Sequence, residues 1–376
     1  MKTNFYGFAL LILLAMRSCQ STDPSSLPNR PALFGPDSSS SVSAPNTIPN
    51  PSSGSPLFSL APSASTSLRL VSPSGPANEH PLQIDAKRAR DYPGSDITIE
   101  ATLDPGVNYS RYYVSYLSDG LKIYAMMTVP TGPKPPTGWP VVIFNHGYIP
   151  PNVYKTTERY VNYLDQIARS GYIVFKSDYR GHDRSEGTPG GAYTQDNYTT
   201  DVLNAVASVK RHPDADPSRI GMWGHSMGGY ITLRSMVISK DIKAGVIWAG
   251  VVAPYPDIYT RWNPSATETT QGPGTWVYSL EQSFGTPESN PQFWNSISAN
   301  SYLKDLSGPI QIHTGTADHD VPWQYSQMLY DEMQAANQLA ELYTYDGDNH
   351  NISNSFSLAM QRTVEFFDRY LKNGSS

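Results

Sequence analysis

Short, continuous runs of apolar residues alternate with amphipathic stretches along most of the chain. The runs have the length and composition of strands buried on both faces, and they cover residues 141–145, 172–176, 220–223, 244–248, 309–313 and 342–345. Helical periodicity predicts helices over residues 156–170, 194–211, 227–237, 323–336 and 355–371. This alternation predicts an α/β fold with a mostly parallel central sheet and helices on both of its faces.

Two features depart from the alternation. An Asp119-Gly120 turn joins two β-rich segments, 111–116 and 121–129, which predicts an antiparallel hairpin at one edge of the sheet. Residues 251–299 are rich in Pro, Trp, Tyr and Phe and follow a central strand. A long insertion at this point is typical of a lid or pocket wall, and a packed helical excursion is the alternative. Residues 88–376 are predicted to form one α/β domain.

The N-terminal part of the chain has another character. Residues 1–18 place Lys2 before an apolar run, 8–16, that is too short to span a bilayer, as in a signal peptide. Cys19 follows, and residues 16–18 before it resemble the lipobox of bacterial lipoproteins, although Arg17 is unusual there. Residues 21–80 contain 17 Ser and 11 Pro without sustained periodicity, which predicts a disordered tether over residues 19–87. We expect an exported protein, lipid-anchored to a bacterial membrane through Cys19 or otherwise secreted.

Composition excludes several functional classes. The chain has 27 Lys and Arg against 33 Asp and Glu, so no basic excess is available to neutralise nucleic acid. The single cysteine excludes an intramolecular disulfide framework and a cysteine-based zinc site, and no H-E-x-x-H spacing is present. We therefore expect no metal and no cofactor. The lipid is the only membrane contact expected, and the oligomeric state is left open.

The candidate chemistry starts at residues 224–228, Gly-His-Ser-Met-Gly, which fit the pattern G-x-S-x-G. A predicted strand precedes them and a predicted helix follows, as in a nucleophile elbow. Such a turn projects the hydroxyl of Ser226 above the sheet, at a helix N-terminus. The alternative is a Gly-rich helix start that contains an incidental serine.

A serine nucleophile needs a base and a carboxylate that orients the base. Around such an elbow the chain order is Ser, acid, His. His350 lies in a polar loop between the last predicted strand and the last helix, whereas His313 ends a buried strand and His319 comes too early to follow the acid. The acid candidates are Asp318, Asp320, Asp346 and Asp348. The last two lie in the loop of His350 and are better suited to shaping its turn, so Asp318 is chosen, with Asp320 as a turn residue.

The developing oxyanion needs donors that are fixed in advance. One is the backbone N–H of Met227, directly after the nucleophile. The other is expected from the loop Asn145-His146-Gly147-Tyr148, where Gly147 permits close backbone approach and Tyr148 offers its N–H and its hydroxyl. His146 is expected to brace this loop.

From about residue 112 to 370 the sequence resembles the catalytic domain of the prolyl oligopeptidase family of serine peptidases, within the α/β-hydrolase superfamily. The resemblance is carried by NHGY at 145–148, DYRGHDRSEG at 178–187, GHSMGGY at 224–230 and GTADHDVPWQYSQMLY at 315–330. It implies that Asp318 is the triad acid, that His350 is the base and that Tyr148 serves the oxyanion.

The sequence also departs from that family. Classical members place a β-propeller before the hydrolase domain, and residues 20–105 are too few for one. Because the residues that hold a substrate's free amino group in the dipeptidyl branch belong to the propeller, exopeptidase specificity is not carried over. Stand-alone domains of this kind also resemble acyl esterases and dienelactone-hydrolase-like enzymes.

Two classes of function are therefore expected. The first is a serine hydrolase that cleaves a peptide or an ester through an acyl-enzyme, either as a prolyl oligopeptidase-like peptidase or as a carboxylesterase. The second is a catalytically silent surface protein on the same scaffold. Silent relatives usually lack a triad member, and all three are present here.

Overall fold

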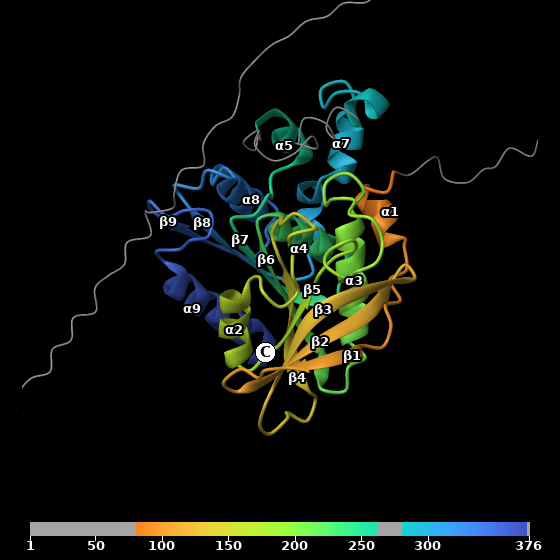
Figure 1. The fold of residues 1–376 in the computed structure, drawn as a ribbon. Helices are drawn as coiled ribbons and strands as arrows, with labels where there is room; N and C mark the ends of the chain where they lie inside the picture. Colours follow the sequence, from red (N-terminus) through yellow and green to blue (C-terminus); the bar gives the residue numbers. More distant parts are fainter. Residues whose placement is uncertain (1–79, 262–279, 374–376) are drawn as a thin grey trace, which may run out of the picture. The chain divides into compact units, whose positions relative to one another are not determined.

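The structure, a computed structural model, describes residues 80–261 and 280–373 (Figure 1). The predicted signal peptide, Cys19, the tether up to residue 79 and residues 262–279 of the insertion lie outside the described residues. Among the residues that are described, no helix has both the length and the apolar character needed to cross a membrane.

A mixed sheet forms the centre of the described domain. Its strands are β1 (Thr98–Leu103), β2 (Tyr109–Ser118), β3 (Leu121–Pro130), β4 (Trp139–Asn145), β5 (Ile173–Ser177), β6 (Ala215–His225), β7 (Ile242–Trp248), β8 (Ile310–Gly315) and β9 (Ala340–Tyr345). Within the described ranges, the nine strands lie in the order β1-β2-β3-β5-β4-β6-β7-β8-β9 (Figure 1). Strands β4 to β9 pair in parallel, and β1, β2 and β3 add antiparallel pairs at one edge. The predicted α/β fold with a mostly parallel sheet is confirmed.

Helices cover both faces of this sheet. They are α1 (Ile84–Arg88), α2 (Val161–Arg169), α3 (Asn197–Val209), α4 (Met227–Ile238), α5 (Tyr255–Arg261), α7 (Pro291–Ile297), α8 (Gln324–Ala335) and α9 (Phe356–Phe367), with a 3-10 helix at Ala299–Asp305 and a π-helix at Asp368–Lys372. Helices α2 and α9 pack on one face, and α3, α4 and α8 pack on the other (Figure 1). Side chains alternate along a strand, so β4 sends Val141 and Ile143 into one core and Val142 and Phe144 into the other.

The domain begins earlier than the sequence predicted. Residues 80–87 were assigned to the tether, but α1 and the residues before it fold onto the domain. Leu82 and Ile84 are fully buried in the core shared with α3 and α4. The guanidinium of Arg234 in α4 donates to the carbonyl of Leu82 at 2.6 Å and to the Asp196 carboxylate at 2.8 Å. Two isolated apolar residues in a polar segment leave no periodicity, and periodicity was the signal used.

The described parts of the insertion join the core. Trp294 of α7 is fully buried, and Tyr255 of α5 is almost so. The hydroxyl groups of Tyr255 and Tyr230 lie 2.5 Å apart, and the Tyr255 hydroxyl also donates to the carbonyl of Tyr193 at 2.9 Å. These segments therefore pack as helices beside α4, and a lid role for residues 251–299 stays a prediction.

Candidate active site

Ser226 occupies a strained turn between β6 and α4. Its φ of 55° and ψ of −119° are conformations that a residue with a side chain adopts rarely, and such strain is a mark of functional sites. The turn is tight: a Cβ on Gly224 would lie 2.1 Å from the carbonyl oxygen of Gly228, and one on Gly228 would lie 2.0 Å from that of Asn145. Both glycines are therefore required, and the side chain of Ser226 is left partly exposed above the sheet.

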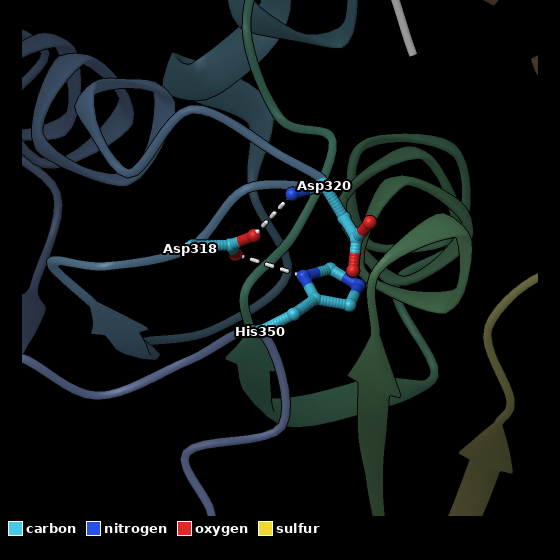
Figure 2. Close-up of side chains that lie close together, drawn as sticks. All are labelled: Asp318, Asp320 and His350. Atoms are coloured by element: carbon cyan, nitrogen blue, oxygen red, sulfur yellow. Dashed lines mark hydrogen bonds and ion pairs between the residues drawn. The ribbon is translucent and has the colours of Figure 1, made fainter. Parts of the chain in front are cut away.

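Asp318 and His350 meet at the carboxyl ends of β8 and β9 (Figure 2). The imidazole Nδ1 of His350 lies 2.8 Å from Oδ2 of Asp318. The other carboxylate oxygen, Oδ1, accepts the backbone N–H groups of Asp320 at 2.8 Å and Val321 at 2.9 Å. The Asp318 side chain is fully buried while 14% of the His350 side chain is exposed. This carboxylate is therefore fixed in place and oriented toward the imidazole.

Asp348 shapes the loop that carries His350. Its carboxylate accepts the backbone N–H groups of Asn349, Asn354 and Ser355 at 3.0, 3.1 and 2.8 Å. Burial alone would raise the pKa of Asp348, but these donors outweigh it and lower the pKa below its usual value. A fixed anion thus holds the turn, which is the role that the sequence suggested for this residue.

Asp320 lies in the turn after Asp318, and its carboxylate also lies beside the base. Figure 2 shows its carboxylate directed at the His350 ring, on the side away from Asp318. One ligand atom from each of Asp318, Asp320 and His350 lies within 4.8 Å of the others, which is close enough for a metal ion. However, both oxygens of Asp318 already accept hydrogen bonds, one of them from the imidazole. The donor set therefore fits the orientation of a base better than the ligation of a metal.

The loop predicted to form the oxyanion hole lies against the nucleophile. A Cβ on Gly147 would lie 3.2 Å from Cβ of Ser226, so the main chain of this loop passes directly over the serine. The Gly147 N–H donates to the Tyr160 hydroxyl at 3.0 Å and is not available to an oxyanion. Tyr148 follows and is 48% exposed beside the site. Met227 opens α4, where the first N–H groups have no partner inside the helix.

The other histidines near the site are packed. His146 is buried between the rings of Tyr154 and Tyr179, with centroid distances of 4.4 and 4.3 Å, and burial lowers its pKa well below the usual value. It braces the loop, as expected. His313 is fully buried and contacts the Tyr345 hydroxyl at 2.8 Å, and burial lowers its pKa to about 3.

Sequence reasoning missed two residues beside the nucleophile, His225 and Tyr160. His225 lies directly before Ser226, and its ring centroid is 4.6 Å from that of His350. Tyr160 precedes α2, and its hydroxyl lies 2.8 Å from Nδ1 of His225. The only signal in the sequence was the histidine inside the G-x-S-x-G pattern, which was treated as a variable position.

An open pocket of about 440 Å³ adjoins this group. It is lined by Ile149, Arg159, Tyr160, Tyr163, Asn351 and Ser353. Ile149 follows the oxyanion loop and Asn351 follows His350, so the pocket lies beside the candidate catalytic groups. It provides space for part of a substrate next to the base.

A sequence-family model for the prolyl oligopeptidase family matches residues 159–374, more than half of the chain. The matched stretch contains Ser226, Asp318 and His350. The chain belongs to this family. Membership of this family supports a serine hydrolase activity for the matched domain.

Individual relatives and solved structures match only part of the chain or of their own length. The uncharacterised protein YfhR of Escherichia coli K12 is 32% identical over 168 residues, which are 44% of this chain and 49% of YfhR. The chain thus spans about half the length of that relative. Acylaminoacyl peptidase of Pyrococcus horikoshii has a TM-score of 0.58 at 22% identity, covering 72% of this chain and 43% of the peptidase. Acetyl xylan esterase of Paenibacillus sp. R4 has a TM-score of 0.57 at 18% identity, covering 75% and 91%. At these identities the two structures establish the fold alone.

Proposed function

We propose that this serine hydrolase is a serine-type peptidase that works through an acyl-enzyme on Ser226. In this proposal His350 is the base, Asp318 orients it, and the backbone N–H groups of Met227 and Tyr148 bind the oxyanion. The observation that carries the proposal is the hydrogen bond of 2.8 Å between Asp318 and His350, in the family whose members are serine peptidases.

The proton follows a closed path in this mechanism. The Ser226 hydroxyl attacks the substrate carbonyl carbon while Nε2 of His350 takes the hydroxyl proton. The imidazolium keeps its Nδ1–H on Asp318, which stabilises the new positive charge. When the tetrahedral intermediate collapses, His350 gives the proton to the leaving amine. A water molecule, deprotonated by the same nitrogen, then releases the acyl group and restores the serine.

A second candidate is ester hydrolysis by the same groups. It is favoured by the match to acetyl xylan esterase over 91% of that chain, because that esterase carries little beyond the shared domain. The peptidase of Pyrococcus horikoshii is matched over only 43% of its length. A small ester can reach the triad of a stand-alone domain, whereas a peptidase commonly uses residues beyond the triad to select its peptide.

A parallel assay of purified protein distinguishes the two. Chromogenic aminoacyl amides and p-nitrophenyl esters of graded chain length are offered to the wild type and to Ser226→Ala. Turnover of amides that Ser226→Ala loses supports the peptidase. Turnover of esters alone supports the esterase and refutes the peptidase. No turnover of either, together with no labelling by a fluorophosphonate, would support the silent scaffold.

We also propose that the enzyme is exported and lipid-anchored through Cys19. The support is the sequence of residues 1–19 alone. Membrane and soluble fractions of cells that produce wild type or Cys19→Ser test it. We expect Cys19→Ser to move the enzyme to the soluble fraction with activity per molecule unchanged. A wild type found wholly in the soluble fraction would contradict the anchor.

A further inference from the structure

Three consecutive hydrogen bonds link the oxyanion loop to the loop of the base. The backbone N–H of Gly147 lies 3.0 Å from the Tyr160 hydroxyl. That hydroxyl lies 2.8 Å from Nδ1 of His225, and Nε2 of His225 lies 3.0 Å from the backbone carbonyl oxygen of His350. This chain of bonds passes beside Ser226, because His225 directly precedes Ser226 in the sequence and Gly147 packs against Cβ of Ser226.

The donor and acceptor of each bond can be assigned from the chemistry of the groups. A carbonyl oxygen only accepts, so Nε2 of His225 must carry the hydrogen that bonds to His350. Burial lowers the pKa of His225 to about 3, so the ring is neutral near pH 7 and Nδ1 carries no hydrogen. The Tyr160 hydroxyl therefore donates to Nδ1 and accepts from the Gly147 N–H. The Tyr160 hydroxyl thus has two partners, each ring nitrogen of His225 has one, and all three bonds donate in the same direction along the chain of bonds.

The backbone of Tyr160 is strained in this arrangement. The residue lies just before α2 with a φ of 60° and a ψ of 20°, a left-handed conformation that is unfavourable for a residue with a side chain. The fit around it is close as well, since a Cβ on Gly147 would lie 2.6 Å from the Tyr160 hydroxyl and 3.2 Å from Nδ1 of His225. Strain of this kind persists only where the surroundings fix it, and it gathers at functional sites.

We infer that Tyr160 and His225 are positioning residues that set the separation of the oxyanion loop and His350 around Ser226. In this role neither residue exchanges a proton with the substrate. Tyr160 holds the main chain one residue before Tyr148, and His225 holds the main chain of the base itself. We call these three hydrogen bonds, from Gly147 through Tyr160 and His225 to His350, the relay. The inference deepens the proposed function and rests on it, because it makes the relay part of the acyl-transfer site at Ser226.

If Tyr160 and His225 position His350, the effect of their loss on the rate depends on the leaving group of the substrate. His350 must give a proton to an alkoxide or amine as it departs, whereas p-nitrophenolate leaves readily without one. A base displaced by a fraction of an ångström therefore slows an alkyl ester or an amide more than a p-nitrophenyl ester. Loss of a merely structural hydrogen bond would reduce the amount of folded enzyme and slow both substrates equally.

The test uses two variants of the relay and one rescue. Tyr160→Phe keeps the ring and removes the oxygen, His225→Leu removes both ring nitrogens, and His225→Gln keeps an amide N–H for His350 and an oxygen for Tyr160. Steady-state kcat and KM are measured with a p-nitrophenyl ester and with the alkyl ester of the same acid. We expect Tyr160→Phe and His225→Leu to lower kcat/KM, which reports the acylation step, by about 10- to 100-fold on the p-nitrophenyl ester, and by about a further tenfold on the alkyl ester. His225→Gln should recover most of the loss.

Tyr172→Phe is the matched control. Its hydroxyl is also buried and donates to Asp368 at 2.6 Å, on the far side of the domain from Ser226. It should leave the ratio of the two kcat/KM values unchanged. A relay variant that lowers both kcat/KM values equally, or neither, would overturn the inference.

The activity of the wild type distinguishes a failure of this inference from a failure of the proposed function. If the wild type turns over no ester and no amide, the proposed function fails. The relay is then tested by the rate of fluorophosphonate labelling, which Tyr160→Phe should lower at least tenfold. An unchanged labelling rate would overturn the inference on its own.

Discussion

Replacing Asp318 by asparagine tests the orientation of the base. The carboxylate serves three donors at once: Nδ1–H of His350 at 2.8 Å and the backbone N–H groups of Asp320 and Val321 at 2.8 and 2.9 Å. An asparagine has one oxygen and one NH₂ for the same two places. It must therefore satisfy either the backbone or the imidazole, and it cannot satisfy both.

The structure indicates which arrangement is favoured. With its oxygen toward the backbone, the amide keeps two hydrogen bonds, each of which contributes about 1 kcal/mol. With its oxygen toward His350, the amide keeps only one hydrogen bond, and its NH₂ faces the two backbone N–H groups of Asp320 and Val321. The first arrangement is favoured, and its NH₂ then donates to Nδ1 of His350. The imidazole proton must move to Nε2, the nitrogen that should accept the proton of Ser226.

The expected effect is a loss of kcat of about 10⁴-fold, the size found when a triad aspartate is replaced so that the histidine takes the wrong tautomer. This loss corresponds to about 5 kcal/mol of activation free energy. The assay is steady-state turnover of the best ester or amide, with thermal unfolding recorded in parallel. The matched control is Asp320→Asn, which removes a charge near the ring but keeps the backbone N–H. We expect it to change kcat by less than about tenfold. If Asp318→Asn stays within tenfold of wild type, or if Asp320→Asn is the more severe variant, the assignment of the acid is wrong.

Three further predictions concern the frame of the site. Gly147→Ala should lower kcat by about 10²-fold with little change in melting temperature, because its Cβ would lie 2.6 Å from the Tyr160 hydroxyl and 3.2 Å from Cβ of Ser226 and would shift the oxyanion loop. Arg234→Leu should lower the free energy of unfolding by about 3–5 kcal/mol in denaturant titrations, since it removes the buried guanidinium that pairs with the Asp196 carboxylate and donates to two carbonyl groups. Stability should also fall as the pH drops from 6.5 toward 4, because burial keeps three histidines neutral in the folded state while the unfolded chain binds their protons. These histidines have lowered pKa values of about 4 for His182 and about 3 for His225 and His313. At about pH 5 each costs about 2 kcal/mol, and a melting temperature that is constant between pH 7 and 5 would contradict this.

The sequence predicted best those catalytic residues that lie at the ends of strands. Ser226, Asp318 and His350 each follow the carboxyl end of a strand (β6, β8 and β9), and parallel strands bring their carboxyl ends to one edge of the sheet. The pairing of Asp318 with His350 could therefore be predicted from strand ends and chain order. The strands themselves were visible as apolar runs because both faces of the sheet are covered by helices.

The rest left weaker signals. Strand β1 was not predicted, because its first five residues are exposed and its pairing with β2, not its own pattern, makes it a strand. The bond between Tyr160 and His225 joins residues 65 positions apart and depends on the left-handed backbone of Tyr160. Side-chain periodicity carries no information about such a conformation. The same holds for residues 80–87, whose buried Leu82 depends on a partner in α4.

The central claim is that Ser226 is the nucleophile of an acyl-enzyme, and mass spectrometry tests it most directly. The wild type is treated with a fluorophosphonate, and the intact mass and the labelled peptide are determined. We predict one adduct per chain, on Ser226, absent from Ser226→Ala and formed at least 10³-fold more slowly by His350→Ala. No adduct on the wild type, or an adduct on another residue that persists in Ser226→Ala, would contradict the account.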